Sequence, residues 1–227
     1  MTGTQRHTRA ALFDIDGSLI DSNYLQVQAW SQAFDQVGHP VDDARIHRAI
    51  ALDSIKMLAA LLGDSAQALG EQAKKLHAAA YHELASRLRP FASARELLAA
   101  VAAHGVAVVL ATSAPEDELK MLRAALDAEP YLSAVTSAED AESAKPDPDI
   151  LQIALDRVAV APDHAVMVGD TIWDGRAAAA AGVTFVGLRS GGIGTDELRG
   201  SGAAAVYEDP ADLLRHLETS PLAGLWV

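Results

Sequence analysis

Short, uninterrupted apolar runs recur through the second half of the chain and occur once near its beginning. The first run is residues 10–13, and the later ones are 106–111, 134–136, 165–168, 184–188 and 204–207. Continuous apolar runs of this length are typical of strands that are buried on both faces of a parallel sheet. The amphipathic stretches between the runs predict helices, since parallel strands need crossover connections. The pattern therefore predicts an α/β fold with a doubly wound parallel sheet.

Helix start and stop signals support this alternation. Residues 93–96 and 113–116 both have the Ser-x-x-Glu spacing of a capping box and predict helices that begin after Ser93 and Ser113. Asp147 precedes a proline, which predicts a capped helix start with proline in the first turn. A further helix is predicted from Trp173 to residue 181 and ends at Gly182.

Residues 18–89 have a different pattern, because they contain helical periodicity and no strand candidate. Apolar residues at helical spacing predict four helices, which end near Gly38, Ile50, Gly63 and Leu84. A normal crossover holds one helix, so this stretch predicts an inserted α-helical cap domain. The predicted organisation is a Rossmann-like core of residues 1–17 and 90–227 with a helical cap at 18–89. The hinges are expected near residues 17–21 and 87–91.

Composition narrows the class of protein. The chain has 227 residues, no cysteine and a formal net charge of −13. This charge argues against binding to nucleic acid or an anionic membrane surface. The polar N-terminus lacks the apolar segment of a signal peptide, and no stretch approaches a membrane span. We therefore expect a soluble cytoplasmic protein without disulfides, and a monomer.

Asp14 and Asp16 follow the first predicted strand directly. Residues i and i+2 of a strand lie on the same face, so both carboxylates are expected to leave the strand end in one direction. Gly17 then allows a sharp turn. Paired acids at the end of a buried strand need compensation, either by a hard cation such as Mg²⁺ or by a role in proton transfer. The alternative is that they only cap the following turn.

Three more polar sites follow later predicted strands, and ligands of open α/β sheets bind at that edge. Thr112 and Ser113 form the first site, although Ser113 is also well placed as a helix N-cap. Lys145 is the second, with a solvated surface lysine as the alternative. Asp170 and Asp174 form the third, because a strand end followed by one helical turn can present two carboxylates to one point.

The order and spacing of these sites resemble the four motifs of the haloacid dehalogenase superfamily. Residues 13–22 (Phe-Asp-Ile-Asp-Gly-Ser-Leu-Ile-Asp-Ser) resemble the first motif, with Ser18 where threonine is commoner. Residues 145–148 (Lys-Pro-Asp-Pro) and 169–171 (Gly-Asp-Thr) resemble the third and fourth. The resemblance covers essentially the whole chain. It is greatest to the helical-cap subfamily of β-phosphoglucomutase-like and phosphoglycolate phosphatase-like proteins.

The resemblance implies a Mg²⁺-dependent phosphatase that acts on a small phosphate ester through an aspartyl-phosphate. Asp14 is expected to attack phosphorus, and Asp16 to act as general acid and base. Metal ligands are expected from Asp14, Asp170, Asp174 and, through its backbone carbonyl, Asp16. The phosphoryl group is expected to contact Thr112, Ser113 and Lys145.

Two alternatives to a phosphatase stay open. A phosphomutase of the β-phosphoglucomutase type would use the same core, and a non-catalytic binding or regulatory protein could share the fold. Asp16 favours phosphoryl transfer over dehalogenation, because displacement of halide from carbon needs no acid for the leaving group.

Substrate specificity is expected on the cap. Lys56, in a predicted turn within residues 51–56, is the leading candidate, with Tyr24 and Arg48 next and a solvated surface role as the alternative. The glycine-rich residues 191–194 are predicted to form a loop after a strand. His77 and His82, five residues apart, are predicted to lie on the surface.

Overall fold

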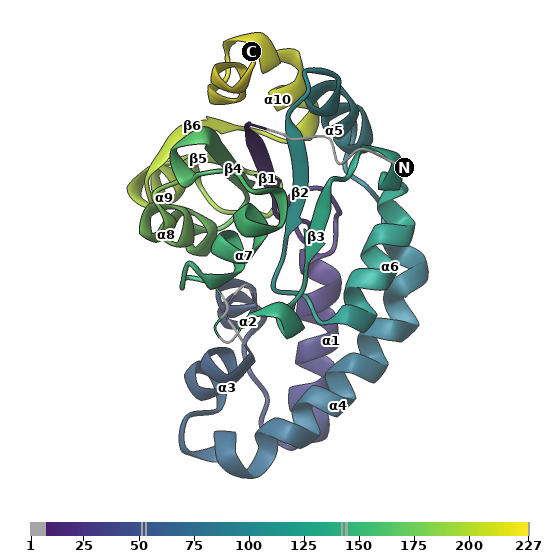
Figure 1. The fold of residues 1–227 in the computed structure, drawn as a ribbon. Helices are drawn as coiled ribbons and strands as arrows, with labels where there is room; N and C mark the ends of the chain where they lie inside the picture. The colour runs from purple at the N-terminus through teal and green to yellow at the C-terminus, as the bar shows by residue number, and fades with distance from the viewer. Residues whose placement is uncertain (1–7, 51, 53, 142, 144, 227) are drawn as a thin grey trace.

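The computed structural model describes residues 8–50, 52, 54–141, 143 and 145–226. It contains a six-stranded sheet in the order β3-β2-β1-β4-β5-β6, in which every neighbouring pair of strands is parallel (Figure 1). The strands are β1 (Ala10–Phe13), β2 (Ala107–Ala111), β3 (Ala134–Thr136), β4 (Ala165–Gly169), β5 (Thr184–Leu188) and β6 (Ala203–Tyr207). The predicted doubly wound α/β fold is confirmed, and each strand lies within one residue of the predicted run at either end.

The order of the strands reverses direction at β1. The chain proceeds from β1 to β2 and β3 on one side and then to β4, β5 and β6 on the other. Ala10 pairs with Ala107 of β2 and with Ala165 of β4, so β1 lies at the centre of the sheet. Ligand sites of open α/β sheets form at the carboxyl ends of the strands where the order reverses, and here that position is the end of β1.

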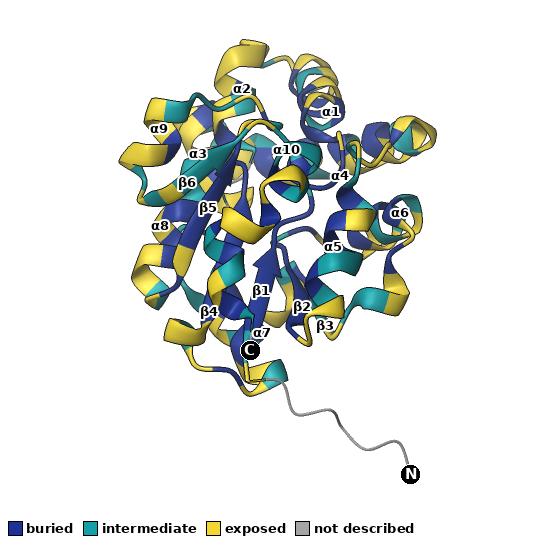
Figure 2. Ribbon diagram, turned by 90° about the horizontal axis from the view of Figure 1, so that it is seen from above, coloured by how far each residue is buried: buried dark blue, intermediate teal, exposed yellow. Residues whose placement is uncertain are grey.

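Helices cover both faces of the sheet, and the alternation of side chains along β1 separates two apolar clusters. Ala11 and Phe13 pack with α5 (Ala94–Ala103), α6 (Glu116–Leu126) and α10 (Pro210–Arg215). Ala10 and Leu12 pack with α7 (Asp149–Val158), α8 (Ile172–Ala181) and α9 (Thr195–Gly200). Figure 2 shows the buried central strands between helices whose outward faces are exposed.

The segment between β1 and α5 folds into helices, as the sequence predicted. They are α1 (Asn23–Gln36), α2 (Asp43–Ala49), α3 (Ser54–Leu62) and α4 (Ala66–Leu84). α1 and α4 pack lengthwise against each other (Figure 1). Trp30 and Phe34 are buried in an apolar cluster of these four helices, whereas Leu25 and Tyr81 join the cluster on one face of the sheet. The helical segment is therefore packed on the core.

The two stretches of chain that connect this segment to the core are hydrogen-bonded to each other. The N–H of Asp21 donates to the carbonyl of Arg89 at 2.8 Å, and the N–H of Phe91 donates to the carbonyl of Leu19 at 2.9 Å. Ile20 and Pro90 form an antiparallel bridge at the same place. The connections lie where hinges are predicted, and the division into core and cap at these residues stays a prediction.

Local details differ from the sequence expectations at three helix starts. Ser93 occupies the N-cap of α5 with a positive φ of 62° and makes no capping hydrogen bond through its side chain. α6 starts two residues later than predicted, with Pro115 at its N-cap, so Ser113 is not a cap. Pro148 is the N-cap of α7, one residue later than predicted.

Lys56 lies within α3 and not in a turn between helices, so that prediction is wrong; Ala51 and Asp53 of the same stretch lie outside the described residues.

Among the described helices, none combines the length and the apolar character needed to cross a membrane. Short 3₁₀ helices occupy Gly63–Ser65, Ala85–Arg87, Glu129–Tyr131, Ala138–Asp140, Pro162–His164, Leu217–Thr219 and Pro221–Leu225.

Candidate active site

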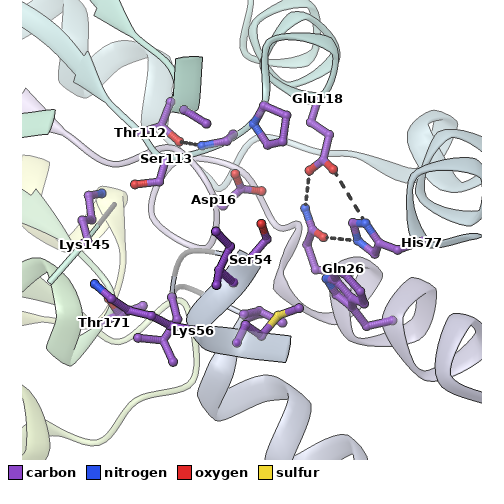
Figure 3. Close-up of a pocket in the computed structure, with 18 of the residues that line it drawn as sticks. Asp16, Gln26, Ser54, Lys56, His77, Thr112, Ser113, Glu118, Lys145 and Thr171 are labelled. Carbon is purple, nitrogen blue, oxygen red and sulfur yellow. Dashed lines mark hydrogen bonds and ion pairs between the residues drawn. The ribbon is translucent and has the colours of Figure 1, made fainter. Parts of the chain in front are cut away.

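Polar side chains gather where β1, β2 and β4 end. Asp14 follows β1, Thr112 follows β2 and Asp170 follows β4. The N–H of Asp14 still donates to the carbonyl of Val168 at 2.9 Å, which fixes the start of the first motif to the sheet. Asp14 and Thr112 border a cavity of about 660 Å³ between the sheet edge and helices α1, α3 and α4 (Figure 3). This volume is in the range of small-molecule sites.

Lys145 lies between two of the carboxylates. Its Nζ is 2.6 Å from Asp14 Oδ1 and 2.7 Å from Asp174 Oδ1, and its side chain is only 4% exposed. Burial by itself would lower the pKa of Lys145, but the two carboxylates outweigh it and raise that pKa above the usual value. Lys145 therefore stays positively charged beside Asp14 and is not a solvated surface lysine.

Asp14, Asp170 and Asp174 form a buried acidic group. One carboxylate oxygen from each lies within 4.8 Å of the others. Burial, with Asp174 as a further cause, raises the pKa of Asp14 to about 7, and burial also raises the pKa of Asp170 well above its usual value. The single positive charge of Lys145 does not balance three buried carboxylates. The oxygen-only donor set and the excess negative charge fit a hard divalent cation such as Mg²⁺.

Asp170 is oriented by the segment that follows β1. Ser18 Oγ donates to its Oδ1 at 2.7 Å, and Asn23 Nδ2 donates to its Oδ2 at 3.0 Å. The loop after β5 also reaches this carboxylate: a Cβ on Gly191 would lie 1.6 Å from Asp170 Oδ2. Gly17 has a φ of +69°, and a Cβ there would lie 2.4 Å from the same oxygen. Glycine is required at both positions because the backbone approaches Asp170 closely.

Asp174 has a second structural role. The Thr171 side chain accepts from the Asp174 N–H at 3.2 Å, and Asp174 Oδ2 accepts from the Thr171 N–H at 3.0 Å, which completes a capping box at the start of α8. The box fixes one oxygen of Asp174 and leaves the other directed at Lys145.

Asp16 lies on the cavity wall but outside the acidic group. Its Oδ1 accepts from Ser22 Oγ at 2.6 Å. Burial raises the pKa of Asp16 to about 6, although the Ser22 hydrogen bond acts in the opposite direction. A carboxyl group with a raised pKa is suited to donate a proton near neutral pH. The expectation that its backbone carbonyl binds the metal stays a prediction.

Thr112 and Ser113 face the same cavity. Thr112 Oγ1 accepts from the Ala114 N–H at 3.0 Å, which leaves its hydroxyl proton available to a ligand. Ser113 Oγ is buried and has no hydrogen-bond partner among the described residues. Because Ser113 caps no helix, its orphan hydroxyl supports a role in binding the phosphoryl group.

Lys56 borders the cavity on the cap side, and its Nζ lies 2.5 Å from Asp147 Oδ2. This ion pair joins α3 to the loop that carries Lys145. A substrate anion would have to compete with Asp147 for Lys56, so the pair weakens the case for Lys56 as a specificity residue. Arg48 is also paired, with Glu197, at 3.3 Å.

A buried polar cluster on the opposite wall was not predicted from the sequence. Gln26 of α1 donates to Glu118 Oε2 of α6 at 2.8 Å, and its Oε1 lies 2.7 Å from His77 Nε2 of α4 (Figure 3). His77 is 5% exposed and stacks on Trp30 with ring centroids 4.0 Å apart, so the prediction that it lies on the surface is wrong. Local sequence carries no signal for this cluster, because its members come from three separate helices.

The members of this cluster are uncharged near neutral pH. Burial lowers the pKa of His77 to about 3, and burial raises the pKa of Glu118 to about 8 despite the hydrogen bond from Gln26. The Gln26 carbonyl oxygen can only accept, so His77 Nε2 carries the ring proton and donates to it. His77 Nδ1 faces Glu118 Oε1 at 3.8 Å.

The raised pKa of Glu118 predicts a pH effect on stability. The unfolded chain loses this proton near pH 4.5 and the folded protein keeps it to about pH 8, so the free energy of unfolding falls as the pH rises between these values. Glu118→Gln retains the neutral shape, so we expect the loss of stability between pH 5 and 8 to be smaller by a few kcal/mol than in the wild type. Urea unfolding of both proteins at pH 5 and at pH 8 measures this loss of stability. The matched control is Glu116→Gln, on the exposed side of α6, which should follow the wild type; an unchanged slope in Glu118→Gln would contradict the shift.

Comparisons with known proteins identify the family. Residues 11–188 match the family model of haloacid dehalogenase-like hydrolases, so the chain belongs to that family, and it is a hydrolase. It is 29% identical over 216 residues to a phosphoglycolate phosphatase of Rhodospirillum rubrum, covering 90% of this chain and 89% of that protein. It is 28% identical over 177 residues to a phosphorylated carbohydrates phosphatase of Thermotoga maritima, covering 77% and 82%.

Solved structures show the same architecture. A hydrolase from Pseudomonas syringae has a TM-score of 0.87 and 35% identity, covering 93% of this chain and 98% of its own. The β-phosphoglucomutase of Clostridium difficile has a TM-score of 0.81 at 17% identity, covering 93% and 96%. At this low identity, the similarity to the Clostridium difficile protein concerns the fold alone.

Proposed function

We propose that this enzyme is a Mg²⁺-dependent phosphatase that hydrolyses a small phosphorylated metabolite through an aspartyl-phosphate. The observation that carries the proposal is the placement of Asp14. Its carboxylate lies at the sheet edge, 2.6 Å from the Lys145 ammonium, and borders the cavity together with Asp16. The relatives named as phosphatases of phosphoglycolate and of phosphorylated carbohydrates support the reaction class.

Asp14 is the nucleophile in this proposal. One of its oxygens attacks phosphorus, a bond forms between that oxygen and phosphorus, and the bond from phosphorus to the leaving oxygen breaks. Lys145 and the hydroxyls of Thr112 and Ser113 neutralise and orient the phosphoryl oxygens. Phosphoryl transfer depends mainly on such positioning and charge stabilisation.

Asp16 moves the proton in both halves of the reaction. As a carboxylic acid it gives its proton to the leaving oxygen. As a carboxylate it then takes a proton from water, whose oxygen attacks phosphorus and breaks the bond to Asp14. Inorganic phosphate and free Asp14 result, so atoms and charges balance over the cycle.

Mg²⁺ would be held by Asp14, Asp170 and Asp174, together with the Asp16 carbonyl. When bound, it would supply positive charge that lowers the repulsion between the Asp14 carboxylate and the phosphoryl oxygens. The hydrogen bonds from Ser18 and Asn23 to Asp170 orient that ligand.

A screen of phosphate esters with Mg²⁺ tests the proposal. Release of inorganic phosphate from at least one ester, abolished by Asp14→Asn, is the expected result. Isomerisation of β-glucose 1-phosphate to glucose 6-phosphate at a rate above phosphate release would favour the phosphomutase alternative. Absence of both activities over a broad panel would favour a non-catalytic role.

The role of Asp16 predicts a dependence on the leaving group. Asp16→Ala should reduce turnover of an alkyl phosphate by about 10²- to 10⁴-fold, the usual contribution of general acid–base catalysis. The loss should be smaller for p-nitrophenyl phosphate, because a good leaving group needs little protonation. Steady-state kcat/KM for the two esters measures the difference, and equal losses for both would argue against an acid that serves the leaving group.

A further inference from the structure

The wall of the cavity facing Asp14 offers no cation that lacks an acidic partner, as far as the described residues show. Three lysines line the cavity, and each forms an ion pair with a carboxylate. The pairs are Lys56–Asp147, Lys74–Glu71 and Lys145–Asp14. Lys145 serves the phosphoryl group in the proposed mechanism, and the charge of each of the other two lysines already faces a carboxylate, so an anionic leaving group would gain less from them than from an uncompensated cation.

The same wall has acidic and neutral polar groups. Asp117 and Glu118 follow each other in the first turn of α6 and both line the cavity. Asp117 is exposed towards solvent, whereas Glu118 is buried and bonded to Gln26. His77 completes this side as an uncharged ring. An anion placed here would meet the Asp117 carboxylate and would lose its hydration without gaining a cation.

Hydroxyl groups match this wall better than a carboxylate does. An O–H can donate to the Asp117 carboxylate and can accept from a serine hydroxyl, whereas a carboxylate can only accept. Ser54 of α3, which borders the cavity, offers one such hydroxyl (Figure 3). Apolar side chains of the cap complete the lining and suit the carbon–hydrogen faces of a sugar or polyol. They include Ile50, Leu52, Ile55 and Met57.

We propose that the enzyme selects phosphate esters whose leaving group is an uncharged polyhydroxy compound and rejects those whose leaving group carries a carboxylate, with Asp117 and the Gln26–Glu118–His77 cluster as the determinants. This inference rests on the proposed phosphatase function. It assigns a specificity role to residues at the junction of α1, α4 and α6.

Three esters of equal carbon number test the selection. They are 2-hydroxyethyl phosphate, 2-aminoethyl phosphate and phosphoglycolate, which end in a hydroxyl, an ammonium and a carboxylate. We expect kcat/KM with Mg²⁺ to be highest for the hydroxyl ester. It should be lower by about tenfold or more for phosphoglycolate, because the carboxylate of its leaving group would find no compensating cation among the described residues of this wall. Equal values, or a preference for the carboxylate, would overturn the inference. A preference for the ammonium would also overturn it, since the wall would then select a cation.

A matched pair of variants locates the effect. Asp117→Lys replaces the exposed acid at the cavity wall, and Glu116→Lys makes the same charge change at the preceding residue, which lines a different surface hollow. Asp117→Lys should move the ratio of kcat/KM towards phosphoglycolate by about tenfold, and Glu116→Lys by less than about twofold. An equal change of this ratio in the two variants would mean that the overall charge of the protein attracts the anion, and the inference would fail.

Turnover of p-nitrophenyl phosphate separates this failure from failure of the proposed function. If the wild type hydrolyses that ester and shows no preference among the three probes, the inference is wrong and the phosphatase function stands. If the wild type hydrolyses neither p-nitrophenyl phosphate nor any probe with Mg²⁺, the phosphatase function is wrong and the inference falls with it.

Discussion

Asp14→Asn should reduce phosphate release by at least about 10³-fold, the scale of loss when a covalent nucleophile is removed. Asparagine has the same shape as aspartate, but its amide is a poor nucleophile and cannot neutralise Lys145. The measurement is phosphate release from the best ester of the screen. Mass spectrometry of acid-quenched enzyme should find a phosphoryl group on the peptide that contains Asp14 in the wild type and not in the variant.

The control for this variant is Asp21→Asn. Asp21 is exposed, seven residues further along the same loop, and borders neither the acidic group nor the cavity as described. It should keep wild-type turnover. Unfolding temperatures of both variants establish that the fold is intact. Turnover above about 1% of the wild type in a folded Asp14→Asn protein would remove Asp14 as the nucleophile.

Removal of divalent metal should abolish turnover, and Mg²⁺ should restore it. The three buried carboxylates repel one another without a cation, and Mg²⁺ suits their small, oxygen-only site. Ca²⁺ should restore little activity, because it prefers more ligands at longer distances. Full activity after exhaustive treatment with EDTA would reject the metal assignment.

Binding of the metal should also be visible in stability, independently of catalysis. At a Mg²⁺ concentration of about 100 times Kd, the wild type should gain about 2.7 kcal/mol, or roughly 5–10 °C in unfolding temperature. Asp170→Asn should lose most of this gain. In EDTA the same variant should be at least as stable as the wild type, because burial and the neighbouring Asp14 raise the pKa of Asp170 and make its charge unfavourable.

The control for the stability experiment is Asp163→Asn. Asp163 is exposed and lies before β4, at the opposite end of that strand from Asp170. Its unfolding temperature should rise with Mg²⁺ as in the wild type. An equal rise in Asp170→Asn would show that Mg²⁺ binds elsewhere.

The sheet and the motifs that follow its strands were predictable because their signals are local. A strand buried on both faces must be apolar along its whole length, so runs such as residues 165–168 mark the strands without knowledge of their neighbours. In a parallel sheet all carboxyl ends meet at one edge. Asp14 and Thr112 directly follow a run, and Asp170 follows one after Gly169, so the three were expected to lie together; the structure places them at the carboxyl ends of β1, β2 and β4.

Exact helix starts and the contacts of individual side chains were less predictable. Ser113 has the spacing of a capping box, but Pro115 at the N-cap moves the start of α6 and leaves the serine hydroxyl facing the cavity. A capping pattern records only a local preference, and the path of the chain out of β2 overrides it. Lys56 was expected in a turn, yet it is helical and paired with Asp147, 91 residues away in the sequence.

Only the tertiary structure decided which side chains form the buried polar cluster on the cavity wall. Gln26 and Glu118 are 92 residues apart and His77 is 51 residues from Gln26, so no pattern along the chain links them. The sequence by itself determined the sheet, the presence of a helical insertion and the residues that follow the strands, because those depend on periodicity and on the geometry common to all parallel sheets. Which faces of α1, α4 and α6 meet depends on how the insertion packs on the core. That packing buries His77 and Glu118 and favours their uncharged forms, because burial removes the water that would otherwise stabilise the charged forms.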